Sequence, residues 1–259
     1  MKVVVTGASG FIGRNVLLRA PREWTVYATY HSTADLPEFV QAEGLANVQA
    51  IRCNLLDVAD VRTLARTIGS RPDAMLYLAA NGDPAASGER PRWDLESNTV
   101  AFVNTLEHCP AAHVVYLSSG AVYDGLRGEV SPDTAVSPRL PYAISKLASE
   151  QYLRFFCEHR GAVDSYVNVR FFGAYGPYEA ARKITTRWLQ GMAAGQREFV
   201  VRGDGRNLID FMYVDEAVDG FLALVKPAGE RRTVDFASGT PISVNDVVAA
   251  MARVLGVTG

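Results

Sequence analysis

The stretch that decides the fold lies at the start of the chain, where Val3–Gly13 reads VVVTGASGFIG. Three β-branched residues, typical of a strand, run directly into three glycines spaced three residues apart. Glycine tolerates the backbone angles of a tight turn, and it lets a phosphate group approach the backbone. The first amides of the following helix then meet the phosphates with the positive end of the helix dipole. We therefore predict a dinucleotide-binding turn formed by Gly7, Gly10, Phe11, Ile12 and Gly13.

Short β-branched runs alternate with longer amphipathic segments along the rest of the chain. We predict strands at Lys2–Thr6, Thr25–Tyr30, Val48–Arg52, Ala74–Ala79, His113–Ser118, Asp164–Arg170 and Thr233–Ala237, and helices at Ile12–Ala20, Val58–Gly69, Asp94–Cys109, Tyr142–His159, Ala181–Ala194, Val214–Val225 and Val244–Leu255. Strands that alternate with helices form a parallel sheet covered on both faces. The sequence thus predicts an α/β fold with a Rossmann-type doubly wound parallel sheet.

The pattern changes after Arg170, where Gly173, Gly176 and Pro177 interrupt the alternation. We expect residues 1–170 to form the dinucleotide-binding domain. Residues 171–259 are expected to form mainly a small C-terminal substrate-binding lobe, with a late strand near 233–237 that returns to the sheet. Because open α/β sheets bind ligands at the carboxyl ends of their strands, a lobe at that edge would form one wall of a cleft.

The composition of the 259 residues argues against several kinds of partner. A net charge of −2 gives no basic field for nucleic acid or for an acidic membrane surface. Three widely spaced cysteines, Cys53, Cys109 and Cys157, fit neither a disulfide framework nor a zinc site, so we expect a cytoplasmic protein. The histidines are scattered, which predicts no metal site. The first predicted strand leaves no room for a signal peptide, and no apolar run is long enough to span a membrane.

Tyr142 and Lys146 stand four residues apart in a predicted helix, so both side chains point from the same face. A phenol with its ordinary pKa of about 10 is a poor base at neutral pH. A nearby ammonium group favours the phenolate, so we expect Lys146 to lower the pKa of Tyr142. Such a pair could move a proton from a substrate hydroxyl while hydride passes to a nicotinamide.

Several segments resemble one family, in the family's order along the chain. The glycine turn, YAISK at Tyr142–Lys146, YLSSGAVYD at Tyr116–Asp124 and YLAA at Tyr77–Ala80 resemble the short-chain dehydrogenase/reductase superfamily, and most of all its extended branch, which acts on nucleotide sugars. The resemblance implies that Ser119, more than its neighbour Ser118, holds the reacting oxygen beside Tyr142 and Lys146. It also implies that Leu78, Ala79, Ala80 and Asn98 lie at the cofactor.

The end of the second strand bears on the choice between NAD and NADP. Members that use NAD carry an acidic residue there, where this chain has Tyr30. His31 and Ser32 could bind a 2′-phosphate instead, and Arg14 could add charge, so the cofactor is NAD(P) and the sequence favours NADP. Asn54 and Leu55 stand where the resemblance implies a contact with the adenine.

The substrate side departs from the family. Ile209 stands where the family usually has a diphosphate-binding arginine, and Gly173 where it usually has an asparagine. Arg182, Lys183, Arg187 and Arg206 are candidates to replace that arginine. Gly259 is also an early end for this family, which is consistent either with a reduced lobe or with an incomplete chain.

The triplet that begins at the serine position indicates the type of reaction. It reads Ser119-Gly120-Ala121, without the acids of the family's 4,6-dehydratases, so dehydration is disfavoured. We predict an NAD(P)-dependent nucleotide-sugar epimerase that transiently oxidises a sugar hydroxyl. The alternatives are an NADPH-dependent reductase of nucleotide-4-keto sugars and, in a different class, a catalytically silent dinucleotide-binding regulator.

The resemblance also implies a homodimer, formed through the helices at 94–109 and 142–159. Ile144, Leu147, Gln151 and Phe155 form an outward seam on the second of these helices that is consistent with such an interface.

Overall fold

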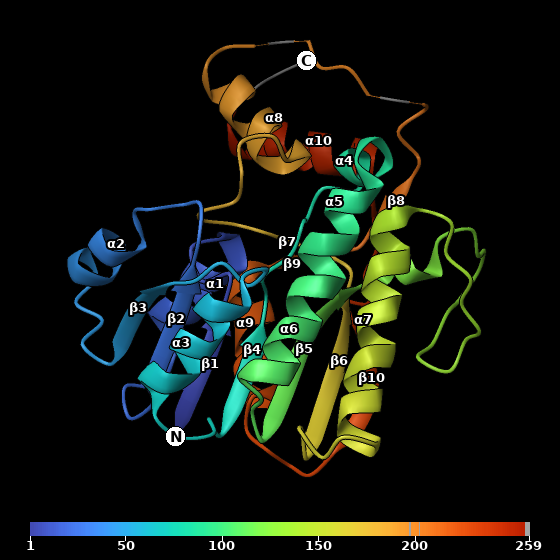
Figure 1. Cartoon of the computed structure of the whole chain (residues 1–259). Coiled ribbons are helices and arrows are strands. Elements are labelled where there is room, and N and C mark those ends of the chain that lie inside the picture. The colour runs from blue at the N-terminus through green and yellow to red at the C-terminus, as the bar shows by residue number, and fades with distance from the viewer. Residues whose placement is uncertain (197, 202, 257–259) are drawn as a thin grey trace.

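A computed structural model describes residues 1–196, 198–201 and 203–256, and its centre is a seven-stranded sheet (Figure 1). The strands are β1 (Lys2–Thr6), β2 (Thr25–Tyr30), β3 (Val48–Arg52), β4 (Ala74–Tyr77), β5 (His113–Ser119), β6 (Ser165–Phe171) and β10 (Arg231–Phe236). They lie in the order β3-β2-β1-β4-β5-β6-β10, and every neighbouring pair is parallel. The predicted doubly wound fold is therefore confirmed, and β1, β2 and β3 have the bounds that the sequence predicted.

Helices cover both faces of the sheet (Figure 1). One face packs against α1 (Phe11–Arg19), α2 (Leu36–Ala42) and α9 (Val214–Leu224), and the other against α3 (Val58–Ile68), α6 (Ala101–His108) and α7 (Pro141–Glu158). The side chains of β1 alternate between the two layers: Val3 and Val5 belong to one core and Val4 to the other. All three valines are at most 1% exposed, as expected for a central strand buried on both faces.

Two short helices were not predicted. Helix α2 has seven residues and buries only Leu36 and Phe39, while α4 (Pro84–Glu89) has six. Neither is long enough to show a helical repeat of apolar residues. Helix α4 begins instead on a cap, because the Asp83 carboxylate accepts the amides of Ala85 and Ala86.

The prediction of one continuous α-helix at Asp94–Cys109 was wrong, because a π-helical turn interrupts it. The structure divides it into α5 (Pro91–Leu95), a π-helical turn η1 (Glu96–Val100) and α6. Ala101 N donates to Glu96 O, five residues back, so the turn holds one residue more than an α-helical turn. As a result Asn98 and Thr99 are both buried against α7.

A small lobe lies above the carboxyl edge of the sheet (Figure 1). It contains α8 (Ile184–Ala193), α10 (Val244–Val254) and the antiparallel pair of β8 (Leu208–Ile209) and β11 (Ile242–Ser243). Trp188, Met192, Val244, Val247 and Met251 form its core. Two further strands, β7 (Ala174–Tyr175) and β9 (Met212–Tyr213), pair in parallel near the sheet. Because α9 and β10 belong to the layers of the sheet, only part of the segment after residue 170 contributes to this lobe.

No helix in the described ranges combines the length and the apolar character that a membrane span requires.

Candidate active site

The glycine turn joins β1 to α1, and packing of the backbone explains two of its three glycines. Gly7 has a φ of +64°, and a Cβ there would lie 2.8 Å from the amide nitrogen of Ala79. A Cβ on Gly13 would lie 2.6 Å from both Gly7 O and Ala8 Cα. Gly10 is different, since its Cβ would meet only Gly7 O, at 3.3 Å. The space beside Gly10 and the first amides of α1 therefore fit the pyrophosphate of a dinucleotide.

Thr6, which the sequence reasoning missed, joins the glycine turn to the end of β4. Its buried hydroxyl oxygen accepts the amide of Leu78 at 3.0 Å and that of Ala79 at 3.1 Å. Leu78 and Ala79 are half-buried and Ala80 is exposed. The segment predicted to contact the cofactor is thus held directly beside Gly7.

At the end of β2, Tyr30 is half-buried, while His31 and Ser32 are exposed. Arg14, which was expected to be available to a 2′-phosphate, is already engaged. Its Nε donates to Ser9 O at 3.0 Å, and its Nη2 lies 2.6 Å from Asp35 Oδ1. No carboxylate stands at the end of β2 itself, but Asp35 places one nearby.

The turn after β3 holds the two residues predicted at the adenine. The backbone amide of Asn54 donates to Asp60 at 2.8 Å, and its side-chain oxygen accepts the amide of Leu56 at 3.1 Å. Leu55 is buried. The oxygen of Asn54 therefore stabilises the turn itself, as asparagine commonly does.

Ser119, Tyr142 and Lys146 lie together at the carboxyl ends of the strands. Ser119 ends β5, and its Oγ accepts the amide of Ala121 at 3.1 Å, which caps the short helix η2 (Gly120–Tyr123). Tyr142 and Lys146 lie in the first turns of α7, with Lys146 Nζ 5.9 Å from the centre of the Tyr142 ring. Ser118 points elsewhere and donates to the buried carboxylate of Glu150, which leaves Ser119 as the catalytic candidate.

Burial dominates the titration of this pair. Burial raises the pKa of Tyr142. The hydrogen bond with the Ser119 hydroxyl lowers this pKa, and the charge of Asp94 raises it further. Burial lowers the pKa of Lys146 to about 8, against the opposing effect of Asp94 and Glu150. The pKa of Tyr142 is therefore raised overall, in contrast to the lowering expected from Lys146, because burial outweighs the opposing effects. Lys146 Nζ instead donates to Leu117 O at 2.8 Å.

Asn98 is fully buried in the π-helical turn, beneath the loop that follows β4. Its Oδ1 accepts the amide of Asn81 at 2.6 Å, and its Nδ2 donates to Asp94 and to Ser145, both at 3.0 Å. Asn98 thus connects the end of β4, helix α5 and helix α7. Neither Asn81 nor Asp94 was singled out from the sequence; the only signal for Asp94 was its position four residues before Asn98.

The basic residues predicted for the substrate side do not form one cluster of contacts. Arg182 reaches from the segment before α8 to Asp83, at 3.5 Å, and so connects this segment with the start of α4. Lys183 and Arg187 are exposed, at the start and in the middle of α8. Arg206 is 86% exposed and lies 3.9 Å from Asp204. Of these, Arg182 has the contact that best places it beside the sheet's carboxyl edge.

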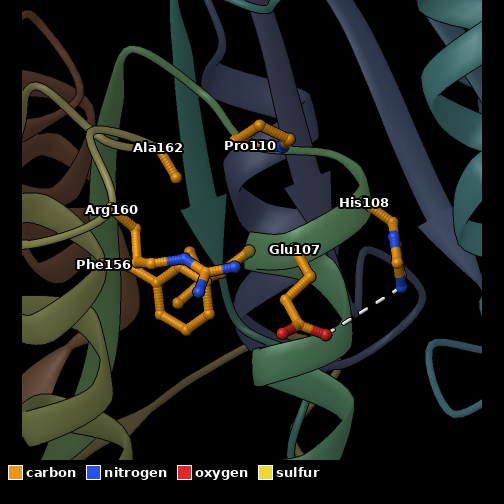
Figure 2. Close-up of a pocket in the computed structure, with 7 residues that line it drawn as sticks. Glu107, His108, Pro110, Phe156, Arg160 and Ala162 are labelled. Carbon is orange, nitrogen blue, oxygen red and sulfur yellow. Dashed lines mark ion pairs between the residues drawn. The ribbon is translucent and has the colours of Figure 1, made fainter.

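A shallow hollow of about 320 Å³ lies at the other end of the sheet (Figure 2). Glu107 and His108 line it from the last turn of α6, Pro110 from the segment that follows, and Phe156 and Arg160 from the end of α7. It lies at the amino end of β5, whereas Ser119 is the last residue of that strand. The hollow is therefore separate from the candidate active site.

Comparison with known families agrees with this geometry. The model of the NAD dependent epimerase/dehydratase family matches residues 3–235. The chain belongs to this family. The resemblance inferred from the glycine turn, the serine strand and the Tyr/Lys helix is thereby confirmed, and so is the assignment to the extended short-chain enzymes.

Individual relatives cover nearly the whole chain. A UDP-glucose 4-epimerase of Mycolicibacterium smegmatis is 27% identical over 99% of this chain and 83% of its own length. The structure of a UDP-glucose 4-epimerase from Thermus thermophilus, in complex with NAD, is 25% identical with a TM-score of 0.85 and covers 99% of this chain and 84% of that one. A UDP-N-acetylglucosamine 4-epimerase from Methanobrevibacter ruminantium is 25% identical with a TM-score of 0.88, over 98% and 82%.

Proposed function

We infer that this protein is an NAD(P)-dependent nucleotide-sugar 4-epimerase. The observation that carries this function is the meeting of Ser119, Tyr142 and Lys146 beside a dinucleotide-binding turn, in a chain whose relatives include UDP-sugar 4-epimerases. The triplet Ser119-Gly120-Ala121 offers no acid for an elimination. The reaction is then a reversible alcohol–ketone oxidation, for which bound nicotinamide supplies the hydride acceptor and donor.

Each residue of the trio has a distinct role in this proposal. Tyr142 takes the proton of the sugar hydroxyl as the carbon is oxidised, and returns it when the ketone is reduced. Lys146 is the positive charge that stabilises the phenolate. Ser119 donates a hydrogen bond to the same substrate oxygen and so fixes its position. Because each cycle oxidises the sugar and then reduces it, the reaction would consume no cofactor.

We propose that the division of labour along the chain follows the predicted boundary. Residues 1–170 would hold the dinucleotide, with contacts from Phe11, Ile12, Asn54 and Leu55 as well as from the glycines. The segment after residue 170 would supply the wall that binds the sugar nucleotide. Arg182 is our first candidate for binding the diphosphate. Its guanidinium is exposed, and its contact with Asp83 places it beside the start of α4, at the carboxyl edge of the sheet.

For the cofactor we propose NADP in preference to NAD. Tyr30 replaces the carboxylate that would repel a 2′-phosphate, and the exposed His31 and Ser32 can donate hydrogen bonds to it. Arg14 could bind the 2′-phosphate only by giving up its ion pair with Asp35. Asp35 therefore competes with the phosphate for Arg14 and weakens the binding of NADP. Asp35→Asn is therefore expected to strengthen the binding of NADP relative to NAD.

The test is an assay of the purified protein on UDP-glucose, UDP-glucuronate and UDP-N-acetylglucosamine, each with no added cofactor, with NAD or with NADP. We expect interconversion of C4 epimers without net formation of reduced cofactor. Stoichiometric consumption of NADPH on a 4-keto sugar would instead identify a ketoreductase. Dinucleotide binding without turnover on any sugar nucleotide would identify a regulator. Tighter binding of NAD than of NADP would overturn the cofactor choice.

We also propose that the protein acts as a cytoplasmic homodimer. Ile144 and Phe155, on the outward face of α7, are 47% and 44% exposed, and Leu147 is half-buried between them. Burying this apolar face against a second copy would remove it from water. We expect Phe155→Arg to convert the dimer to a monomer in light scattering; a wild-type monomer would refute the proposal. The three cysteines are free and buried, which supports a reducing compartment.

A further inference from the structure

A buried carboxylate lies beneath the catalytic helix, at a position the proposed mechanism does not use. Asp94, in α5, is 0% exposed. Its Oδ1 accepts from Asn81 Nδ2 at 2.7 Å and from Asn98 Nδ2 at 3.0 Å, and its Oδ2 accepts from Ser145 Oγ at 2.7 Å. Three donors directed at two oxygens are the arrangement that an ionised, acceptor-only carboxylate requires.

No lysine, arginine or histidine nitrogen in the described ranges lies within ion-pair distance of Asp94, so hydrogen bonds alone satisfy its oxygens. The other buried carboxylate nearby, Glu150, is already neutralised, because Arg170 Nη2 lies 2.9 Å from its Oε2. Lys146 is 4% exposed, and its one hydrogen-bond acceptor among the described residues is Leu117 O. Once Glu150 and Arg170 are paired, the buried charges that remain are one ammonium and one carboxylate.

We propose that Asp94 is the counter-charge of Lys146. In this role Asp94 is a positioning residue whose negative charge keeps the lysine protonated by electrostatic attraction. The inference rests on the proposed function of Tyr142 and Lys146 and adds a residue to it. Burying an uncompensated charge is costly, and an opposite charge nearby favours the charged form. The hydrogen bond from Ser145, the residue directly before Lys146, fixes where that carboxylate lies relative to α7.

Among the described residues around Lys146, Glu150 is the other carboxylate that raises its pKa, but Glu150 is already paired with Arg170. Helix α7 contributes Tyr142 and the already paired Glu150, β6 contributes Arg170, and β5 contributes Tyr116, whose ring lies 5.1 Å from Nζ. On α4 and at its end, Glu89 and Arg90 are exposed. The charge of Asp94 raises the pKa of Lys146, against the effect of burial, and it also raises the pKa of Tyr142.

The first experiment is the pH profile of kcat/KM for Asp94→Asn. Asparagine can keep the network, because its oxygen still accepts from Asn81 and Asn98, while Ser145 Oγ can donate to Tyr142 O, 2.9 Å away. Loss of the negative charge lowers the pKa of both Tyr142 and Lys146. Both limbs of the profile should therefore move to lower pH, by about one unit. Activity that falls equally at every pH would overturn the proposal.

The matched control is Glu96→Gln. It removes the same charge two residues further along, where Glu96 pairs with Arg92 at 2.9 Å on the exposed side. A charge in water is screened, so this profile should stay in place. A shift as large as that of Asp94→Asn would mean that net charge, and not position, is responsible.

The second experiment needs no turnover, so it separates this inference from the proposed function. Lys146→Met leaves the carboxylate of Asp94 buried without a counter-charge, whereas the unfolded chain keeps the same carboxylate in water, so folding becomes less favourable as the pH rises. The thermal midpoint of Lys146→Met should fall more steeply between pH 5 and 8 than that of the wild type. Adding Asp94→Asn should restore the wild-type slope. Equal slopes for wild type and Lys146→Met would refute the coupling, even if the protein proves to be an epimerase.

Discussion

Replacing Tyr142 by phenylalanine should lower kcat by about a thousandfold, while KM and the affinity for the dinucleotide change little. The hydroxyl is the only part of the side chain that is lost, and in the proposed reaction it carries the proton of the sugar hydroxyl. Tyr142 lies beside Ser119, whose hydroxyl lowers the pKa that burial raises. The measurement is steady-state epimerisation of the accepted UDP-sugar, together with a cofactor titration.

Tyr152→Phe is the matched control, because Tyr152 lies on the same helix but is 45% exposed on its outer side. This variant should keep wild-type kcat. If Tyr142→Phe also kept more than about a tenth of the wild-type kcat, Tyr142 would not be the base. A variant that lost dinucleotide binding together with turnover would point to a structural role of the hydroxyl instead.

The central sheet was predictable because the strands are short β-branched runs and the turn after β1 is formed by glycines. Both signals are local, so they can be read from consecutive residues. Helix α2 was not predictable in this way, since its stability comes from placing Leu36 and Phe39 in a core whose other members are distant in sequence. The π-helical turn at Asn98 was missed for the same reason, because its hydrogen bonds are to Asn81 and Ser145.

The residues of the site were easier to predict than their electrostatics. The resemblance to the family indicated Ser119, and the four-residue spacing of Tyr142 and Lys146 predicted that both lie on one face of a helix. The effect of Lys146 on Tyr142 was predicted from proximity alone, which left out the burial of both groups and the charge of Asp94. A lone aspartate 52 residues before Lys146 gives no sign in the sequence that it is buried. Burial depends on the packing of α5 against α7, which only the fold supplies.

The glycine turn allows a second test with a large expected effect, in which two similar substitutions should behave differently. Gly13→Ala places a methyl group 2.6 Å from Gly7 O and from Ala8 Cα, so α1 must move away from the turn. We expect the free energy of unfolding to fall by about 3 kcal/mol. Dinucleotide binding should be lost with it, because the first amides of α1 would no longer lie over the phosphates.

Gly10→Ala should separate stability from binding. Gly10 has a φ of −80°, which alanine adopts freely, and its methyl group would meet only Gly7 O, at 3.3 Å. The free energy of unfolding should therefore change by less than about 1 kcal/mol. The methyl group would nevertheless occupy the space where we place the pyrophosphate, so dinucleotide affinity should fall by at least about tenfold. Denaturant unfolding and a fluorescence titration of both variants measure the two effects. If Gly10→Ala bound the dinucleotide as tightly as the wild type, the phosphates would not lie at this turn, and the role of the opening glycines would have to be structural alone.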